Sequence, residues 1–186
     1  MERMFYNITW SDIDSKIIQD IEHAKETPGF DINLGYKDNW SLLITAVYYC
    51  RKELVRYILS FPNIDVNHRS YYGNTALHCC DNVSILKLLL DHKDLDVNIQ
   101  NEGGETGLHH ACYMGRKTCV KEYLLDARAD ILIRDENGVM VRDYALIYGY
   151  LGIANILKRV QHTSLLRIPN RALLHDIVRM IIDEYT

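Results

Sequence analysis

Apolar runs long enough to cross a bilayer are absent from this sequence of 186 residues, and its opening stretch, MERMFYNITWSDID, has no apolar segment behind a basic head. These absences argue against a membrane span and against a signal peptide. Hydrophobic residues make up 48% of the chain and charged residues 25%, which is ordinary for a soluble globular protein. We therefore expect a folded chain that has no membrane partner.

Clusters of Lys and Arg are also missing, and the net charge at pH 7 is −4. Nucleic-acid binding draws most of its affinity from clustered basic side chains that neutralise phosphates. A nucleic acid is therefore not an expected partner. The stretch 102-EGGE-105 is no phosphate loop either, because carboxylates flank its glycines and would repel an anion.

A disulfide framework is the third absence. The cysteines number five, which is odd, and they are scattered along the chain. Such usage is typical of reduced thiols, so we expect a cytoplasmic or nuclear protein. The five are Cys50, Cys79, Cys80, Cys112 and Cys119.

Two short stretches do combine His with Cys, namely 78-HCC-80 and 104-GETGLHHACYMG-115. They could supply metal ligands, or a thiol with its base. A zinc site needs four ligands that converge in a tetrahedron, and although His109 and Cys112 would share a helix face, no second ligand pair has metal spacing. A search for repeats favours a third interpretation, in which these residues belong to a structural unit.

Four segments of the chain align with one another: 41-SLLITAVYYC-50, 75-TALHCC-80, 106-TGLHHACYMG-115 and 140-MVRDYALIYG-149. An aliphatic helical run follows each of them, which predicts a pair of helices in every unit. The starts are 34 residues apart (41 to 75), then 31 (75 to 106), then 34 (106 to 140). One three-residue deletion between Cys80 and Ile85 explains the short interval. We expect it to shorten the first helix or the turn of that unit and to leave a notch in the surface.

The period and the Gly-x-Thr-Ala-Leu-His pattern at Gly73–His78, with its counterpart at Gly104–His109, resemble the ankyrin repeat. The resemblance implies an all-α solenoid of stacked helix-turn-helix units with short β-hairpin-like loops. The resemblance covers about residues 10–162, and we expect a single domain, residues 1–186. The expected parts are an N-terminal capping repeat (1–36), internal repeats (37–69, 70–100 and 101–134), a last repeat (135–162) and a C-terminal capping helix (163–186).

Turn and cap residues agree with these units. Gly73, Gly104 and Gly138 occupy positions where a tight turn needs a positive φ. Thr75 and Thr106 then suit the N-cap of the helix that follows, because their hydroxyls can accept free backbone N–H groups.

The resemblance also gives the His and Cys residues a structural role. In the family, histidines at the positions of His78 and His109 bridge neighbouring turns by hydrogen bonds. Four of the cysteines take positions where the family places small or aliphatic core residues, and free Cys behaves as a small hydrophobe. We therefore expect no metal, no cofactor, no small-molecule substrate and no enzymatic activity.

The segment 169-PNRALLHDIVRMIIDEYT-186 carries an apolar stripe at helical spacing, which predicts an amphipathic helix beginning near Pro169. The simpler interpretation is a cap that covers the last repeat. The alternative is an adaptor, in which the repeats hold a client and this helix recruits machinery. Ile168-Pro169 followed by Leu173 and Leu174 is faintly similar to the F-box-like segment of some ankyrin proteins.

The function implied by the resemblance is protein recognition on the concave face made by the hairpin tips and the first helices. Aromatic residues gather at the matching positions, and such residues are common in interface hot spots. We expect the partner to lay an apolar helical or extended segment across them. The alternative is that tyrosines at helix ends pack against the next repeat. The candidate partner-binding residues are Trp40, Tyr48, Tyr49, Tyr71, Tyr72, Tyr113, Met114, Val139, Ile147 and Tyr148.

Asn67 and Asn98 each follow the spacing Leu-x5-Asp-x-Asn. Asparagines in this setting of ankyrin repeats are frequent substrates of an asparaginyl hydroxylase, so the resemblance implies hydroxylation at both positions in a host that has the enzyme. The alternative is that Asn is simply a favoured hairpin residue.

Overall fold

The computed structural model describes residues 14–165 and 171–184. The expected helix start at Pro169 and the F-box-like pair Ile168-Pro169 lie outside these residues. Within the two ranges the chain forms nine α-helices and one short 3-10 helix. They are α2 (Asp14–Ala24), η1 (Lys37–Asn39), α3 (Leu42–Tyr48), α4 (Lys52–Leu59), α5 (Val83–Leu90), α6 (Gly107–Tyr113), α7 (Lys117–Leu125), α8 (Val141–Ile147), α9 (Leu151–Leu165) and α10 (Arg171–Glu184).

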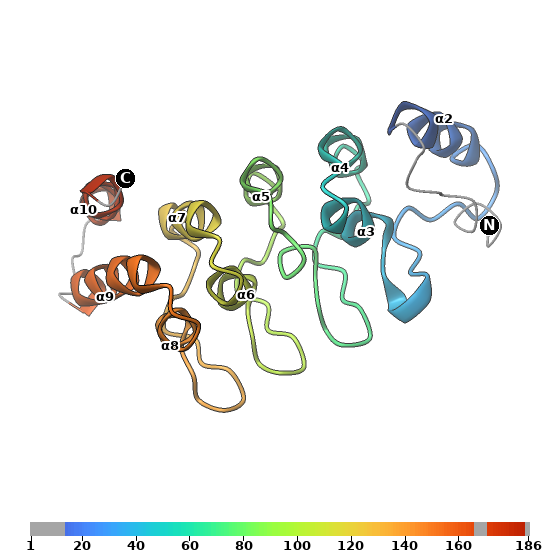
Figure 1. The fold of residues 1–186 in the computed structure, drawn as a ribbon. Coiled ribbons are helices and arrows are strands. Elements are labelled where there is room, and N and C mark those ends of the chain that lie inside the picture. The colour runs from blue at the N-terminus through green and yellow to red at the C-terminus, as the bar shows by residue number, and fades with distance from the viewer. Residues whose placement is uncertain (1–13, 166–170, 185–186) are drawn as a thin grey trace.

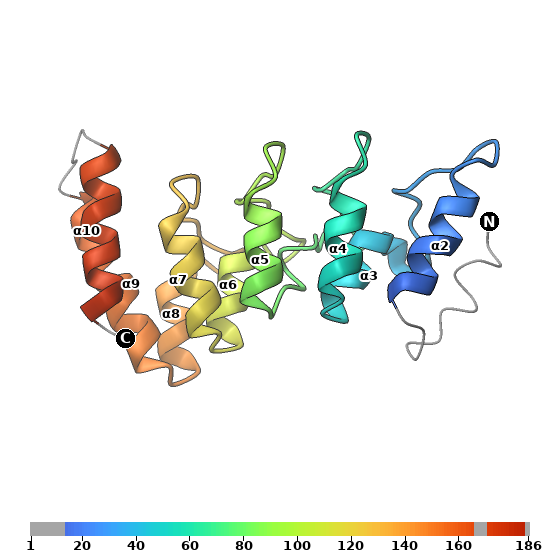
Figure 2. The same cartoon turned by 90° about the horizontal axis from the view of Figure 1, so that it is seen from above.

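The helices stand in two rows (Figure 1). The inner row contains α3, α6 and α8, and the loops before them extend away from the outer row of α4, α5, α7 and α9. Figure 2 shows the outer helices standing side by side along the stack. The two described ranges contain no strand, only one isolated bridge between Arg134 and Met140. The expected all-α solenoid with hairpin-like loops is therefore confirmed. We call the surface formed by the loop tips and the inner helices the hairpin face.

Capping chemistry begins the inner helices where the sequence predicted it. The hydroxyl of Thr106 accepts the His109 backbone N–H at 3.4 Å, and His109 Nδ1 accepts the Thr106 N–H at 3.1 Å. This reciprocal pair satisfies two donors that the helix start would otherwise leave free. Gly73, Gly104 and Gly138 have φ values of 73°, 75° and 77°, as the tight turns require.

The third unit departs from the others. Residues 70–82 are all described, and they form turns where the other units form an inner helix. Thr75 therefore caps no helix, which corrects one expectation, because the deletion leaves too few residues for a helical turn to continue. The chain passes between α3 and α6 as a loop and then enters α5 (Figure 1). The expected shortening of the first helix is thus confirmed, and it goes as far as removing that helix.

The next unit fastens this shortened loop. His78 Nε2 donates to the carbonyl oxygen of Glu105 at 2.9 Å, and Arg116 Nη2 lies 3.1 Å from Asp81 Oδ2. The ring of His78 also accepts the Thr75 N–H at Nδ1, over 3.1 Å. His78 is therefore the structural bridge that the sequence predicted, and its bonds replace part of what the lost helix would contribute.

The core runs the length of the stack between the two rows. Ile85, Leu86 and Leu89 of α5 are fully buried, and so is Tyr123 of α7. Burying one such side chain stabilises the fold by about 1.5–3 kcal/mol, so stacking the units supplies the hydrophobic stabilisation that no unit has alone. Among the described helices, none is both long and apolar enough to span a membrane.

Two asparagines, Asn67 and Asn98, connect the loops that follow the outer helices of successive units. The side-chain N–H of Asn67 donates to the carbonyl of Asp94 at 2.7 Å, and its Oδ1 accepts the backbone N–H of Asp96 at 2.9 Å. Asn98 repeats the arrangement with Arg128 O (2.8 Å) and Asp130 N–H (2.9 Å). Both asparagines therefore tie one unit to the next.

At the C-terminal end, α10 packs against α9 and α7 and buries Val178, Ile181 and Ile182. This arrangement is that of a helix covering the last repeat. α9 runs past the expected repeat end at residue 162 and reaches Leu165, since the sequence contains no helix breaker there. At the other end, Ile17 and Ile21 of α2 are buried, and α2 packs on α4.

Candidate functional site on the hairpin face

Two clusters of aromatic side chains lie on the hairpin face, at the ends of the inner helices. In the first, the rings of Trp40 and Tyr48 meet edge to face with centroids 5.3 Å apart, and Tyr48 meets Tyr49 in the same way at 5.0 Å. In the second, Tyr113 and Tyr148 meet at 4.6 Å with an interplanar angle of 86°. These are favourable aromatic geometries, so each cluster forms a fixed apolar surface.

Most of the predicted binding residues are exposed. Ile147 is 67% exposed, and the tip residues Tyr71 and Tyr72 are 70% and 62% exposed. Trp40 and Val139 are half-buried. The structure exposes, in addition, Tyr48, Tyr49, Tyr113, Met114 and Tyr148. Exposed apolar side chains on one face are what a protein-binding surface requires.

The aromatic residues of the hairpin face fall in two groups. The first cluster belongs to α3 and the second to α6 and α8, and the third unit, which has no inner helix, lies between them. A cavity of about 630 Å³ occupies this place. We call it the notch pocket; its lining residues are Trp40, Tyr48, Asn74, His78, Cys79, Asp81, Asn101, Glu105, His110 and Met114.

The sequence predicted a notch here but not the residues that line it. Of the predicted binding residues, Trp40, Tyr48 and Met114 border the cavity. Asp81 was missed, because the repeat pattern assigns it to a loop without a binding role. The signal that could have found it was the deletion itself, since removing a helix exposes whatever flanks it.

A hydrogen-bond network fixes one side of the notch pocket. Asn101 Nδ2 donates to Asn74 Oδ1 at 3.0 Å and to Glu105 Oε2 at 3.1 Å. The hydroxyl oxygen of Tyr144 lies 2.6 Å from Glu105 Oε1 and 2.9 Å from Asp135 Oδ2, and its one proton is shared between the two carboxylates. The Glu105 carboxylate is therefore held in place by two neutral donors.

Asp81 also lines the notch pocket. Its Oδ2 accepts from Arg116 at 3.1 Å, while its Oδ1 is buried and has no hydrogen-bond partner among the described residues. A carboxylate oxygen in that position is costly to the folded state, so it calls for a compensating group.

The histidines and cysteines of this region are not set up for covalent chemistry. Burial lowers the pKa of His78 to about 4, and it raises the pKa of Cys79 to about 11. Burial likewise raises the pKa of Cys112 and lowers that of His109. A reactive thiol needs a depressed pKa, which is the opposite shift. The described residues contain no cluster of three or more potential metal ligands.

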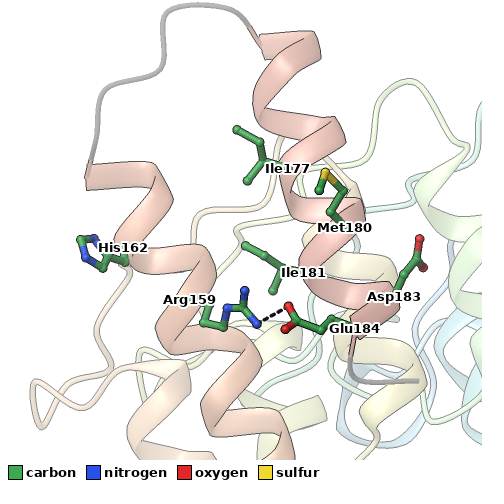
Figure 3. A pocket seen from close by; sticks show the side chains of 7 residues that line it. All are labelled: Arg159, His162, Ile177, Met180, Ile181, Asp183 and Glu184. Atoms are coloured by element: carbon green, nitrogen blue, oxygen red, sulfur yellow. Dashed lines mark hydrogen bonds and ion pairs between the residues drawn. The ribbon is translucent and has the colours of Figure 1, made fainter.

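A second cavity, of about 680 Å³, lies between α9 and α10 (Figure 3). Ile177, Met180 and Ile181 line it from α10, and an ion pair between Arg159 and Glu184 crosses it. Met180 is 71% exposed. This cavity is on the end of the stack and is separate from the hairpin face.

Comparison with known proteins gives two family matches. Residues 16–101 match the model "Ankyrin repeats (3 copies)", and residues 89–145 match "Ankyrin repeats (many copies)". The SMC5-SMC6 complex localization factor protein 1 of Bos taurus is 35% identical over 102 residues, which are 53% of this chain and 10% of that protein. The putative ankyrin repeat protein FPV031 of fowlpox virus is 36% identical over 113 residues, 58% of this chain and 33% of that one.

A more distant relative covers more of the chain. The target of rapamycin complex 2 subunit AVO2 of Saccharomyces cerevisiae is 25% identical over 146 residues, 76% of this chain and 34% of that protein. The chain thus spans between a tenth and about a third of the length of these three relatives.

Proposed function

Since this chain belongs to the ankyrin-repeat proteins, we propose that it binds a partner protein with its hairpin face. The observation that carries the proposal is the pair of exposed aromatic clusters, Trp40 with Tyr48 and Tyr113 with Tyr148, on the two sides of the notch pocket. Large aromatic side chains bury much area for little loss of rotamer entropy, and they dominate interface energies.

The partner presents an extended or helical segment that lies across both clusters. Such a segment covers apolar ring surface on each side and places one of its side chains over the notch pocket between them. Two relatives are named for assemblies, one as a localization factor of the SMC5-SMC6 complex and one as a subunit of target of rapamycin complex 2. Membership of a protein assembly is consistent with a binding role for this chain.

Affinity capture with the intact chain tests the proposal. Two exposed methionines provide a test variant and a matched control. Met114 borders the notch pocket and is 37% exposed, whereas Met180 on α10 is 71% exposed and distant from the hairpin face. We expect Met114→Ala to reduce capture of the main partner and Met180→Ala to leave it unchanged. Equal capture by both variants, with both folded, would overturn the assignment of the hairpin face.

An adaptor role is the second candidate, and the exposed Met180 beside the cavity between α9 and α10 favours it. In that role the repeats hold a client and α10 binds a second protein. Because α10 packs against α9 and α7, deleting it would disturb the fold, so a point change is the better test. Met180→Glu should release one captured protein and retain another; release of none would contradict the adaptor role.

We infer that the chain is a non-catalytic binding module of the cytoplasm or nucleus, without nucleic acid or a small molecule as ligand. The raised pKa values of the Cys79 and Cys112 thiols support the absence of thiol catalysis. The free state of all five cysteines supports a reducing compartment.

A further inference from the structure

We propose that the notch pocket receives a basic side chain, arginine or lysine, from the partner segment bound on the hairpin face. This inference rests on the proposed function and adds the chemistry of the residue that is recognised. It follows from three features of the lining: an aromatic wall, a Glu105 carboxylate without a balancing cation, and the absence of Lys and Arg from the lining residues that the structure describes.

The aromatic wall consists of Trp40 and Tyr48. Both line the cavity, and their edge-to-face contact at 5.3 Å holds the two rings in a fixed relation. A cation within about 6 Å of the face of a Trp or Tyr ring is attracted by the electrons of the ring, and the attraction grows when water is excluded. The wall therefore suits a guanidinium or ammonium group better than a neutral polar group.

The negative charge of the notch pocket comes first from Glu105. Its two oxygens accept hydrogen bonds from Tyr144 and Asn101, which are neutral, and among the described residues no cation pairs with it. Those two bonds fix the carboxylate while leaving lone pairs for a further donor. The Glu105 carboxylate is thus oriented by its neighbours and able to accept a hydrogen bond from a ligand.

Asp81 also lines the notch pocket and carries a second carboxylate. Arg116 pairs with its Oδ2 from outside the lining, and its Oδ1 has no partner among the described residues. The two imidazoles do not offset the carboxylates at neutral pH, because burial lowers the pKa of both His78 and His110 and keeps them uncharged.

Other side chains fit this environment poorly. An acidic side chain would be repelled by Glu105 and Asp81. An apolar side chain would remove water from the Glu105 carboxylate without replacing its hydrogen bonds, which is unfavourable. Arg or Lys can lay its aliphatic stem against Met114 and Trp40 while its charged head reaches the carboxylates.

The test uses peptides of random sequence displayed on phage and selected against the intact chain. We expect the enriched peptides to share one Arg or Lys. Replacing that residue by norleucine, which keeps the stem and removes the charge, should weaken binding about tenfold. With Glu105→Gln the same replacement should change binding less than about twofold, because the charge that it meets is gone.

Glu102 provides the matched control. It lies at the same loop tip but outside the lining of the notch pocket, so Glu102→Gln should preserve the tenfold preference. Circular dichroism reports whether each variant folds. If Glu105→Gln does not fold, Tyr48→Leu replaces it, since that change removes part of the aromatic wall at an exposed position and should also reduce the preference.

The outcomes separate this inference from the proposed function. Enriched peptides that bind equally well with norleucine, but lose affinity with Tyr113→Ala, would overturn the basic-residue inference and leave the binding role of the hairpin face intact. Peptides that are insensitive to Tyr113→Ala, to Trp40→Leu and to Glu105→Gln would overturn both. A selection that enriches no peptide would also contradict the proposed function.

Discussion

The hydroxyl of Tyr123, on α7, donates to the carbonyl oxygen of Leu77 at 3.4 Å, across the place where the third unit has no inner helix. Leu77 lies in the turn that replaces that helix, and its carbonyl also accepts the backbone N–H of Cys80 at 3.4 Å. Tyr123 is fully buried, and a side chain added at Gly107 would come within 2.5 Å of its oxygen. The tyrosine therefore fills the space that the deletion opens, and the glycine leaves room for it.

Removing that hydroxyl should destabilise the protein. Tyr123→Phe keeps the ring but removes one of the two hydrogen bonds that the Leu77 carbonyl accepts, which costs about 0.5–1.5 kcal/mol of unfolding free energy. Gly107→Ala should cost about 1–3 kcal/mol, because the new methyl group overlaps the Tyr123 oxygen. Urea denaturation followed by circular dichroism measures both. An unchanged midpoint for Gly107→Ala would show that the packing around Tyr123 is looser than described.

Acid should weaken the fold through His78. Burial lowers its pKa to about 4, whereas in the unfolded chain the value is about 6.5. The unfolded state therefore binds more protons between these two values, and stability falls as the pH falls through that window. From pH 7 to pH 5 we expect His78 to account for a loss of roughly 2 kcal/mol. Unfolding curves at the two pH values measure it.

The variant His78→Gln isolates this contribution. Glutamine does not titrate, so the variant should start less stable at pH 7 and lose less stability on acidification than the natural chain. An equal loss in both proteins would assign the acid sensitivity to other groups, such as His109 and His110, whose pKa values burial also lowers.

Asn67 should matter for stability independently of any modification. Asn67→Ala removes two hydrogen bonds to the next unit, to Asp94 and Asp96, at a cost of about 1–3 kcal/mol.

We also propose that Asn67 and Asn98 are hydroxylated. Mass spectrometry of the chain isolated from animal cells should show each residue heavier by one oxygen. A spectrum with neither residue shifted contradicts that proposal and leaves the stability prediction unaffected.

Substituting Tyr113 or Tyr49 should affect partner binding without affecting the stability of the fold. Both are exposed on the hairpin face, so truncating either to Ala should weaken partner binding by about 1–3 kcal/mol and barely change the melting temperature. Titration calorimetry with the captured partner and thermal unfolding measure the two effects. A lowered melting temperature with unchanged affinity would make these tyrosines structural.

The stack itself could be predicted from the sequence because each unit repeats the same local chemistry. Thr106 caps α6 by reciprocal hydrogen bonds with His109, and the turn glycines take a positive φ. Both features depend only on residues close in the sequence. The complete loss of the third inner helix was harder to predict, since whether a shortened segment still forms a helical turn depends on what packs against it. Here Tyr123 and His78 stabilise the turn, and Tyr123 is on a different repeat.

The notch pocket could be predicted only as a location. Glu105 and Asp81 reach it from different units, and Glu105 is held there by Tyr144, far along the chain. Such contacts between units are not visible in the repeat period. The aromatic residues were easier to predict, because the resemblance assigns each of them a position on the exposed face.

Hydrogen exchange of the chain with and without its captured partner tests the binding role of the hairpin face most directly. We expect binding to slow exchange in the loop tips and in the ends of α3 and α6, around Tyr48 and Tyr113, and to leave α10 unchanged. Slowed exchange confined to α9 and α10, with the loop tips unaffected, would contradict binding on the hairpin face.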